Sequence, residues 1–126
     1  MRIISGNLKG RKILLPIDKN TRPLRDLVKE SIFNLMEHSN KFKLKIKGSN
    51  ILDLFSGSGS FGIECISRGA KRVFFIENYL DALKILKKNV SNLNISKKYQ
   101  IFEEDCFKIF RFKKIINKKL DKIFID

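Results

Sequence analysis

The sequence contains few of the side chains that bind metals or form disulfides. Of its 126 residues, only two are cysteine and one is histidine. Cys65 and Cys106 lack the close spacing of a zinc motif, and His38 alone cannot complete such a site. We therefore expect no metal centre, and buried, free thiols in a reducing compartment such as the cytoplasm.

Long apolar runs are also missing from the sequence. No segment reaches the roughly 20 apolar residues of a membrane-spanning helix. The first twelve residues, MRIISGNLKGRK, lack the apolar core of a signal peptide. A content of 43% hydrophobic and 32% charged residues is typical of a globular protein, and the length suits one domain. We expect a monomer without a membrane anchor.

Negative charge is scarce, and the formal net charge is +14. The excess lies in residues 1–50, with +8, and in residues 79–126, with +6, whereas residues 51–78 are neutral. A neutral centre between cationic flanks suits a small-molecule site surrounded by a surface that binds a polyanion. Charge therefore favours nucleic acid as the partner, although a Lys/Asn/Ile-rich compositional bias would give a similar excess.

The apolar pattern predicts alternating strands and helices. Residues 2–15 indicate a cationic β-hairpin with a turn between Gly6 and Gly10. Tract 41–47 fits either a strand or a linker. Helices are expected at 21–38, 61–68, 80–93 and 107–120, and strands at 50–55, 72–77, 99–105 and 122–126. This order predicts an α/β fold with a doubly wound, mostly parallel sheet.

The helix expected over residues 21–38 carries one apolar stripe. Arg22, Arg25 and Lys29 lie off this stripe. The stripe consists of Leu24, Leu27, Val28, Ile32, Leu35 and Met36. Such a stripe predicts the face that packs on the core.

The stretch LDLFSGSGSFG places three glycines, Gly57, Gly59 and Gly62, in the pattern G-x-G-x-x-G between a strand and a helix. Such glycines permit a tight turn, close approach of the backbone to a ligand, and close packing of the helix. Glu77 ends the next strand, where a carboxylate can accept hydrogen bonds from ribose hydroxyls. These features suit a dinucleotide and S-adenosylmethionine equally.

Asp53, just before the glycines, favours S-adenosylmethionine. A carboxylate near the helix N-terminus would repel the pyrophosphate of a dinucleotide. S-adenosylmethionine carries no phosphate, and an acid favours its sulfonium and ammonium groups. The alternative is that Asp53 caps local backbone amides.

Four stretches together resemble a known family. RIISGNLKGRK, TRPLRDLVKESIFN, LDLFSGSGSFGIECISRGA and RVFFIE resemble, in order, the bacterial 16S small-subunit rRNA guanine-N2 methyltransferases of the RsmD type. The resemblance implies a Rossmann-like class I methyltransferase that transfers a methyl group from S-adenosylmethionine to N2 of a guanine. Its partner would be small-subunit rRNA or the assembling small subunit. It divides the chain into a hairpin, residues 1–20, and a partial methyltransferase domain, residues 21–126.

The resemblance also implies roles for individual residues. Glu77 would bind the ribose hydroxyls, with Asn78 beside the adenine. Asp105 and Cys106 match the adenine-contacting acid and its neighbour, and Asp105 could also cap the following helix. The methionine part would lie against Asp53 and the backbone of Phe55, Ser56, Gly57, Ser58 and Gly59. RNA would lie against Arg2, Lys9, Arg11, Lys12, Arg22 and Arg25.

The catalytic motif of that family is D-P-P followed by Tyr or Phe, which orients the base for methyl transfer. Asp126 matches its first position, and the other three residues fall outside the chain. We therefore expect a C-terminally truncated chain with an incomplete sheet, low stability and severely impaired methyl transfer. Leu24, Arg25 and Leu27 also differ from the residues that usually follow T-R-P, which weakens the expectation of substrate contacts there.

Three alternatives remain open. The chain could be an RNA-binding module without a catalytic step, an amino-methyltransferase acting on another RNA or DNA base, or a dinucleotide oxidoreductase. Binding of S-adenosylhomocysteine, binding of NADH and the identity of the methylated nucleotide distinguish them.

Overall fold

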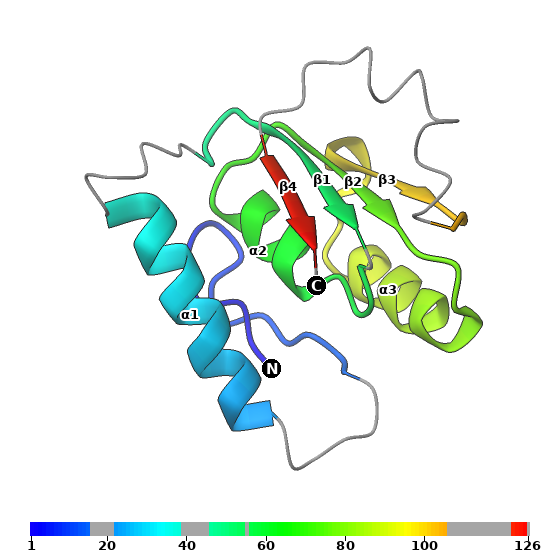
Figure 1. Cartoon of the computed structure of the whole chain (residues 1–126), viewed down its shortest axis with the longest axis horizontal. Coiled ribbons are helices and arrows are strands. Elements are labelled where there is room, and N and C mark those ends of the chain that lie inside the picture. Colours follow the sequence, from blue (N-terminus) through cyan, green and yellow to red (C-terminus); the bar gives the residue numbers. More distant parts are fainter. Residues whose placement is uncertain (16–21, 39–45, 55, 106–121, 126) are drawn as a thin grey trace.

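A computed structural model describes residues 1–15, 22–38, 46–54, 56–105 and 122–125, with only the backbone for 22–26 and 122–125. The described elements follow one another along the chain (Figure 1). They are α1 (Arg22–His38), β1 (Asn50–Leu54), α2 (Ser60–Ser67), β2 (Arg72–Ile76), α3 (Leu80–Asn92), the 3-10 helix η1 (Ser96–Lys98), β3 (Tyr99–Phe102) and β4 (Lys122–Ile125). These bounds agree with the predicted elements to within a few residues. The expected helix 107–120 and most of tract 41–47 lie outside the described residues.

The four strands form a parallel sheet in the order β3-β2-β1-β4. This order confirms the predicted α/β fold with a doubly wound, parallel sheet. Strands β2 and β3 lie on one side of β1, and β4, which comes later in the chain, lies on its other side. Strand β1 thus lies at the point where the strand order reverses, and ligands of such sheets bind at the carboxyl end of the strands there. The segment with Gly57 and Gly59 joins this end of β1 to α2, which contains Gly62 (Figure 1).

Both faces of the central strands β1 and β2 are buried, which fits their largely apolar sequences. Strands β1 and β2 are buried along almost their whole length, as is usual for parallel sheets. Alternate residues form two clusters. Ile51, Val73 and Phe75 pack with residues of α2 and α3 in the main core, whereas Leu52, Phe74 and Ile76 form a second cluster on the other face.

Residues 1–13 fold back on themselves through a single antiparallel bridge between Arg2 and Lys12. The Ile3 N–H donates to the Arg11 carbonyl over 2.9 Å, and the Ile13 N–H donates to that of Met1 over 2.8 Å. The predicted turn between Gly6 and Gly10 is present, and the flanking residues form this bridge in place of two full strands. Ile3 and Ile13 belong to the main core, so the segment packs directly on the α/β unit.

Helix α1 turns a different face to the core than the apolar stripe predicts. Lys29 and Phe33 are fully buried, whereas Leu27 is 62% and Leu35 is 59% exposed. The prediction that the stripe packs inward is therefore wrong for these leucines, and Lys29, which lies off the stripe, is buried in their place. The cause is a buried carboxylate on α2, Glu64, which pairs with the Lys29 amino group.

Within the part of the chain that the structure describes, no helix is long and apolar enough to cross a membrane. The same residues contain no group of three or more metal-ligating side chains. Cys65 is buried in the core, in agreement with the sequence analysis, and Cys106 lies outside the described residues.

Candidate functional site

The glycine loop, residues 56–59, joins the carboxyl end of β1 to α2. Gly57 and Gly59 have φ values of +56° and +83°, in the left-handed region that favours glycine. A Cβ atom on Gly59 would lie 2.4 Å from Cδ1 of Leu86 on α3. The loop therefore requires glycine for its turn and for its close approach to α3. On the adjoining helix, a Cβ atom on Gly62 would lie 2.3 Å from the Phe75 ring, so this glycine lets α2 approach β2.

The backbone N–H groups of this region donate mainly within the protein. Four bonds run from Ser56 N to Ile76 O (3.1 Å), from Gly57 N to Glu77 Oε1 (2.8 Å), from Gly59 N to Ser56 O (2.8 Å) and from Gly62 N to Asp53 Oδ2 (3.2 Å). A phosphate cradle needs such N–H groups directed at the ligand. In this structure these four N–H groups are directed at protein acceptors.

Asp53 lies in the middle of the sheet, in register with Phe75 of β2 and Phe124 of β4. Its side chain is fully buried. One carboxylate oxygen accepts the N–H of Gly62 in the first turn of α2. The amide-capping role that the sequence analysis considered is therefore present. A carboxylate at this helix end also interacts favourably with the helix dipole, and its charge would repel an anion placed there.

Ser56 joins the ends of β1 and β2 through its side chain. Its hydroxyl donates to the carbonyl of Asp53 over 2.7 Å and accepts the N–H of Ile76 over 3.0 Å. Only the backbone of this residue was expected to take part in the site. A serine directly after a strand is a weak signal for such a local side-chain to backbone bond.

Glu77 follows β2 and holds both the glycine loop and the next turn. Oε1 accepts the N–H of Gly57 over 2.8 Å, and Oε2 accepts those of Asn78 and Tyr79 over 3.1 Å each. A carboxylate has about four acceptor positions, so three such bonds leave capacity for one further donor. Asn78 is exposed beside it.

Acidic residues lie at or after the carboxyl ends of three adjacent strands. Asp53 is near the end of β1, Glu77 follows β2, and the half-buried Asp105 follows β3. The parallel strands have their carboxyl ends on the same side of the sheet (Figure 1). Phe55, Cys106 and Asp126, which the sequence analysis adds to the site, lie outside the described residues.

The cationic side chains of the N-terminal segment are exposed. The Arg2 guanidinium donates to the carbonyl of Gly10 over 2.8 Å, and that of Arg11 donates to the carbonyl of Asn92 over 2.9 Å, at the end of α3. Lys9 lies in the turn and Lys12 in the bridge, and both are exposed. Arg22 and Arg25 belong to the first turn of α1, and their side chains lie outside the described part of the chain.

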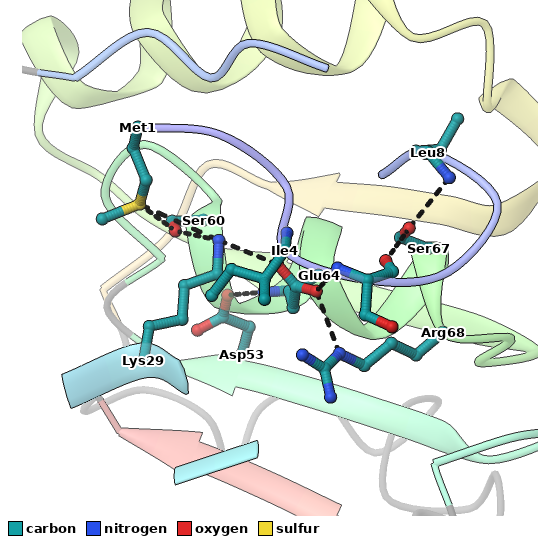
Figure 2. Close-up of polar contacts among 11 residues, drawn as sticks. Met1, Ile4, Leu8, Lys29, Asp53, Ser60, Glu64, Ser67 and Arg68 are labelled. Carbon is teal, nitrogen blue, oxygen red and sulfur yellow. Dashed lines mark hydrogen bonds and ion pairs between the residues drawn. The ribbon is translucent and has the colours of Figure 1, made fainter. Parts of the chain in front are cut away.

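A buried ionic cluster beside the glycine loop was not predicted (Figure 2). The Glu64 carboxylate is 3.1 Å from the Lys29 amino group and 2.9 Å from Nε of Arg68. It also accepts the N–H groups of Ile4 and Ser5, over 2.9 and 3.0 Å. The i,i+4 spacing of Glu64 and Arg68 could have indicated their pairing, but no sequence signal connects Glu64 to Lys29.

The electrostatics of this cluster keep Glu64 ionised. Burial raises the pKa of Glu64, but the hydrogen bond from Ile4 and the charges of Lys29 and Arg68 outweigh it, so the pKa lies below the usual 4.5. The Lys29 amino group also donates to the hydroxyl of Ser60 over 3.0 Å, at the start of α2. The cluster thus joins the N-terminal segment, α1 and the helix that follows the glycine loop.

The chain matches a known protein family over residues 1–126. The model of a family described as conserved hypothetical protein 95 matches residues 1–126. The ribosomal RNA small subunit methyltransferase D of Buchnera aphidicola subsp. Acyrthosiphon pisum is 42% identical over 124 residues, 98% of this chain and 60% of that protein. The protein of the same description from Haemophilus influenzae is 42% identical over 97 residues, 76% of this chain and 47% of that protein. The chain spans 60% or less of the length of these relatives.

Solved structures confirm the fold. The Escherichia coli protein yhhF, assigned as a methyltransferase, has a TM-score of 0.70 and 29% identity over 86% of this chain and 55% of that chain. A Thermus thermophilus protein described as hypothetical has a TM-score of 0.75 and 21% identity over 99% of this chain and 67% of that chain. At that identity the second likeness concerns the fold alone. The architecture is that of a class I methyltransferase.

Proposed function

The chain belongs to the RsmD-type family, whose model is described as conserved hypothetical protein 95, and we propose that it forms the donor-binding part of an RNA methyltransferase. The proposed donor is S-adenosylmethionine. The observation that carries the proposal is the internal hydrogen bonding at the glycine loop, where Gly57 and Gly59, together with Gly62 of α2, donate their N–H groups to protein acceptors. A dinucleotide would need such groups for its phosphates.

The residues at the carboxyl ends of these strands fit a cationic ligand without phosphate. When bound, S-adenosylmethionine supplies an electrophilic methyl group on a positively charged sulfur. Its methionine part would lie against the loop backbone, with Phe55 as a further predicted contact. The buried charge of Asp53 would favour the sulfonium and ammonium groups across the loop. Asp53 thereby combines two tasks, because its carboxylate also fixes the start of α2 through Gly62.

The remaining contacts are assigned to the ends of β2 and β3. Glu77 has acceptor capacity beyond its three backbone bonds, and we assign it to a ribose hydroxyl. Asn78 is exposed next to it and is assigned to the adenine. Asp105, with Cys106, is also assigned to the adenine.

The proposed acceptor is a guanine N2 amine in small-subunit rRNA. The relatives named as small-subunit rRNA methyltransferases support the class of substrate. The exposed Arg2, Lys9, Arg11 and Lys12 suit a phosphate backbone. Arg22 and Arg25 are assigned to the same partner, and Asp126 to an N–H of the target amine.

Thermal unfolding of the chain tests the donor assignment. S-adenosylhomocysteine at about 100 times its Kd should stabilise the chain by about 2.7 kcal/mol, which raises the midpoint by several degrees. NADH should leave the midpoint unchanged, and Asp53→Ala should remove the protection by S-adenosylhomocysteine. Protection by NADH in place of S-adenosylhomocysteine would establish the oxidoreductase alternative.

Binding to a small-subunit rRNA fragment tests the acceptor assignment. We expect binding that weakens steeply with salt concentration, because phosphate contacts release counterions. RNA binding without donor protection would identify an RNA-binding module. Where methyl transfer is detected, mapping the methylated nucleotide separates guanine N2 from another RNA or DNA base.

A further inference from the structure

Asn89 is a polar residue on the apolar face of α3. The helix packs on the core through Leu83, Leu86 and Val90, and Asn89 is buried among them with 2% exposure. An amide placed in such surroundings is costly unless its polar atoms form hydrogen bonds. Its presence therefore requires partners that the helix itself does not supply.

The side chain of Asn89 joins two segments that are distant in the sequence. Its Oδ1 accepts the N–H of Leu14 over 2.8 Å, and its Nδ2 donates to the carbonyl of Leu14 over 3.0 Å. Nδ2 also donates to the carbonyl of Ser58 over 2.9 Å. The Leu14 N–H and the two carbonyl acceptors fix the orientation of the amide, because exchange of its oxygen and nitrogen would mismatch all three bonds.

The bond to Ser58 holds a peptide group at the centre of the glycine loop. The peptide between Ser58 and Gly59 has its carbonyl bound to Asn89 and its N–H bound to the carbonyl of Ser56. The loop has glycines on both sides of Ser58, which by themselves permit several backbone conformations. Asn89 therefore restrains this peptide from one side, and Ser56 restrains it from the other.

We propose that Asn89 is a positioning residue for the methyl donor: its amide fixes the Ser58–Gly59 peptide and ties the loop to the N-terminal segment at Leu14. This inference rests on the proposed function for the identity of the ligand. Asn89 touches neither the donor nor the RNA. It acts by keeping the loop backbone in the conformation that the donor requires, which lowers the cost of ordering the loop on binding.

A purely structural role for Asn89 would be to dock the N-terminal segment. Ser67, the last residue of α2, also docks the N-terminal segment through its side chain (Figure 2). Its hydroxyl donates to the carbonyl of Ser5 over 2.5 Å and accepts the N–H of Leu8 over 2.9 Å. Ser67→Ala is therefore the matched control for segment docking.

The test compares Asn89→Leu, which keeps the approximate volume and removes all three bonds, with Ser67→Ala and the unaltered chain. S-adenosylhomocysteine affinity is measured by calorimetry well below the unfolding midpoints. We expect Asn89→Leu to weaken the affinity about 10-fold, as for the loss of one or two hydrogen bonds, and Ser67→Ala to change it less than about 2-fold. Equal affinities for Asn89→Leu and the unaltered chain, or equal losses for the two variants, would overturn the inference.

Two readouts keep this test separate from the proposed function. In the absence of ligand, hydrogen exchange of the Gly59 amide should accelerate in Asn89→Leu and not in Ser67→Ala; unchanged exchange would contradict the positioning role.

In the unaltered chain, S-adenosylhomocysteine should shift the side-chain amide signals of Asn89 and leave those of the exposed Asn92 in place. If the unaltered chain binds the ligand and the Asn89 amide signals do not shift, the inference is contradicted. This readout does not depend on whether Asn89→Leu folds. Absence of binding by the unaltered chain would refute the proposed function instead.

Discussion

The carboxylate of Glu77 accepts a hydrogen bond of 2.8 Å from the backbone N–H of Gly57, 20 residues earlier in the chain. The acid at the end of β2 therefore closes the glycine loop that leaves β1. The sequence spacing predicted a ribose-binding acid, and the structure adds a second task for the same residue. Loop conformation and ligand contact would then depend on one side chain.

Replacement of Glu77 by glutamine should weaken donor binding. Glutamine offers one acceptor oxygen and an NH2 group, so one backbone N–H among Gly57, Asn78 and Tyr79 would face a donor. Loss of a hydrogen bond to a charged group costs about 1.5–3 kcal/mol, or roughly 10- to 100-fold in affinity. Calorimetry with S-adenosylhomocysteine measures the change. Glu104→Gln, on an exposed acid nearby, is the control, and equal affinities for the two variants would refute the role of Glu77.

Gly59→Ala should disrupt the loop more than Gly10→Ala disrupts the N-terminal turn. The two glycines have nearly the same φ, +83° and +85°, so both substitutions carry a left-handed strain of about 1–2 kcal/mol. Only at Gly59 does the new Cβ meet a neighbour, Cδ1 of Leu86 at 2.4 Å, whereas nothing lies within 4 Å at Gly10. Overpacking adds about 1–3 kcal/mol. Urea unfolding compares the two, and equal decreases in stability would contradict the observed packing.

The Glu64 cluster should make stability depend on pH. Because the pKa of Glu64 is lowered in the folded chain, its contribution is present above the usual 4.5 and is lost as the pH falls through the folded-state value. Glu64→Gln leaves the buried Lys29 charge without its carboxylate and should cost about 3–5 kcal/mol at pH 7. Unfolding free energies between pH 7 and 3 should converge for the two proteins at low pH. A constant difference would show that the ionised carboxylate is not responsible.

The lysines of the N-terminal turn should contribute to RNA affinity. Lys9→Gln combined with Lys12→Gln removes two exposed charges and retains the guanidinium bonds of Arg2 and Arg11. The slope of log Kobs against log salt concentration should fall by about 0.7–0.9 for each phosphate that the variant no longer neutralises. The matched control combines Lys97→Gln with Lys98→Gln in η1, where both lysines are also exposed. Equal changes in this slope for the two double variants would indicate that RNA affinity depends only on the total charge of the chain.

Local sequence patterns predicted much of the fold and of the loop. The apolar runs around Phe74 and the helical spacing of Leu83, Leu86 and Val90 predicted β2 and α3, since these elements pack through patterns of their own residues. The spacing of the glycines predicted a tight turn after β1, whereas the ribose-binding role of Glu77 stays a prediction. The left-handed φ values of Gly57 and Gly59 agree with the predicted turn.

The contacts that escaped prediction join residues distant in the sequence. Lys29 lies off the apolar stripe of α1, and the sequence does not indicate its burial, because its partner, Glu64, lies 35 positions away. Asn89 likewise acts on Leu14 and Ser58, which no local spacing connects to it. Sequence periodicity indicates which face of a helix is apolar. In α1, however, the face that carries the buried Lys29–Glu64 ion pair packs on the core.

The most direct test of the account is a titration of the isotopically labelled chain with S-adenosylhomocysteine, followed through its backbone amide signals. Binding at the proposed site should shift the signals of Gly57, Ser58, Gly59, Glu77 and Asn78, while those of Lys97 and Lys98 in η1 stay in place. NADH at the same concentrations should produce no such shifts. Shifts of the loop signals by NADH alone, or an absence of shifts in the loop at saturating S-adenosylhomocysteine, would contradict the central claim that this loop holds the methyl donor.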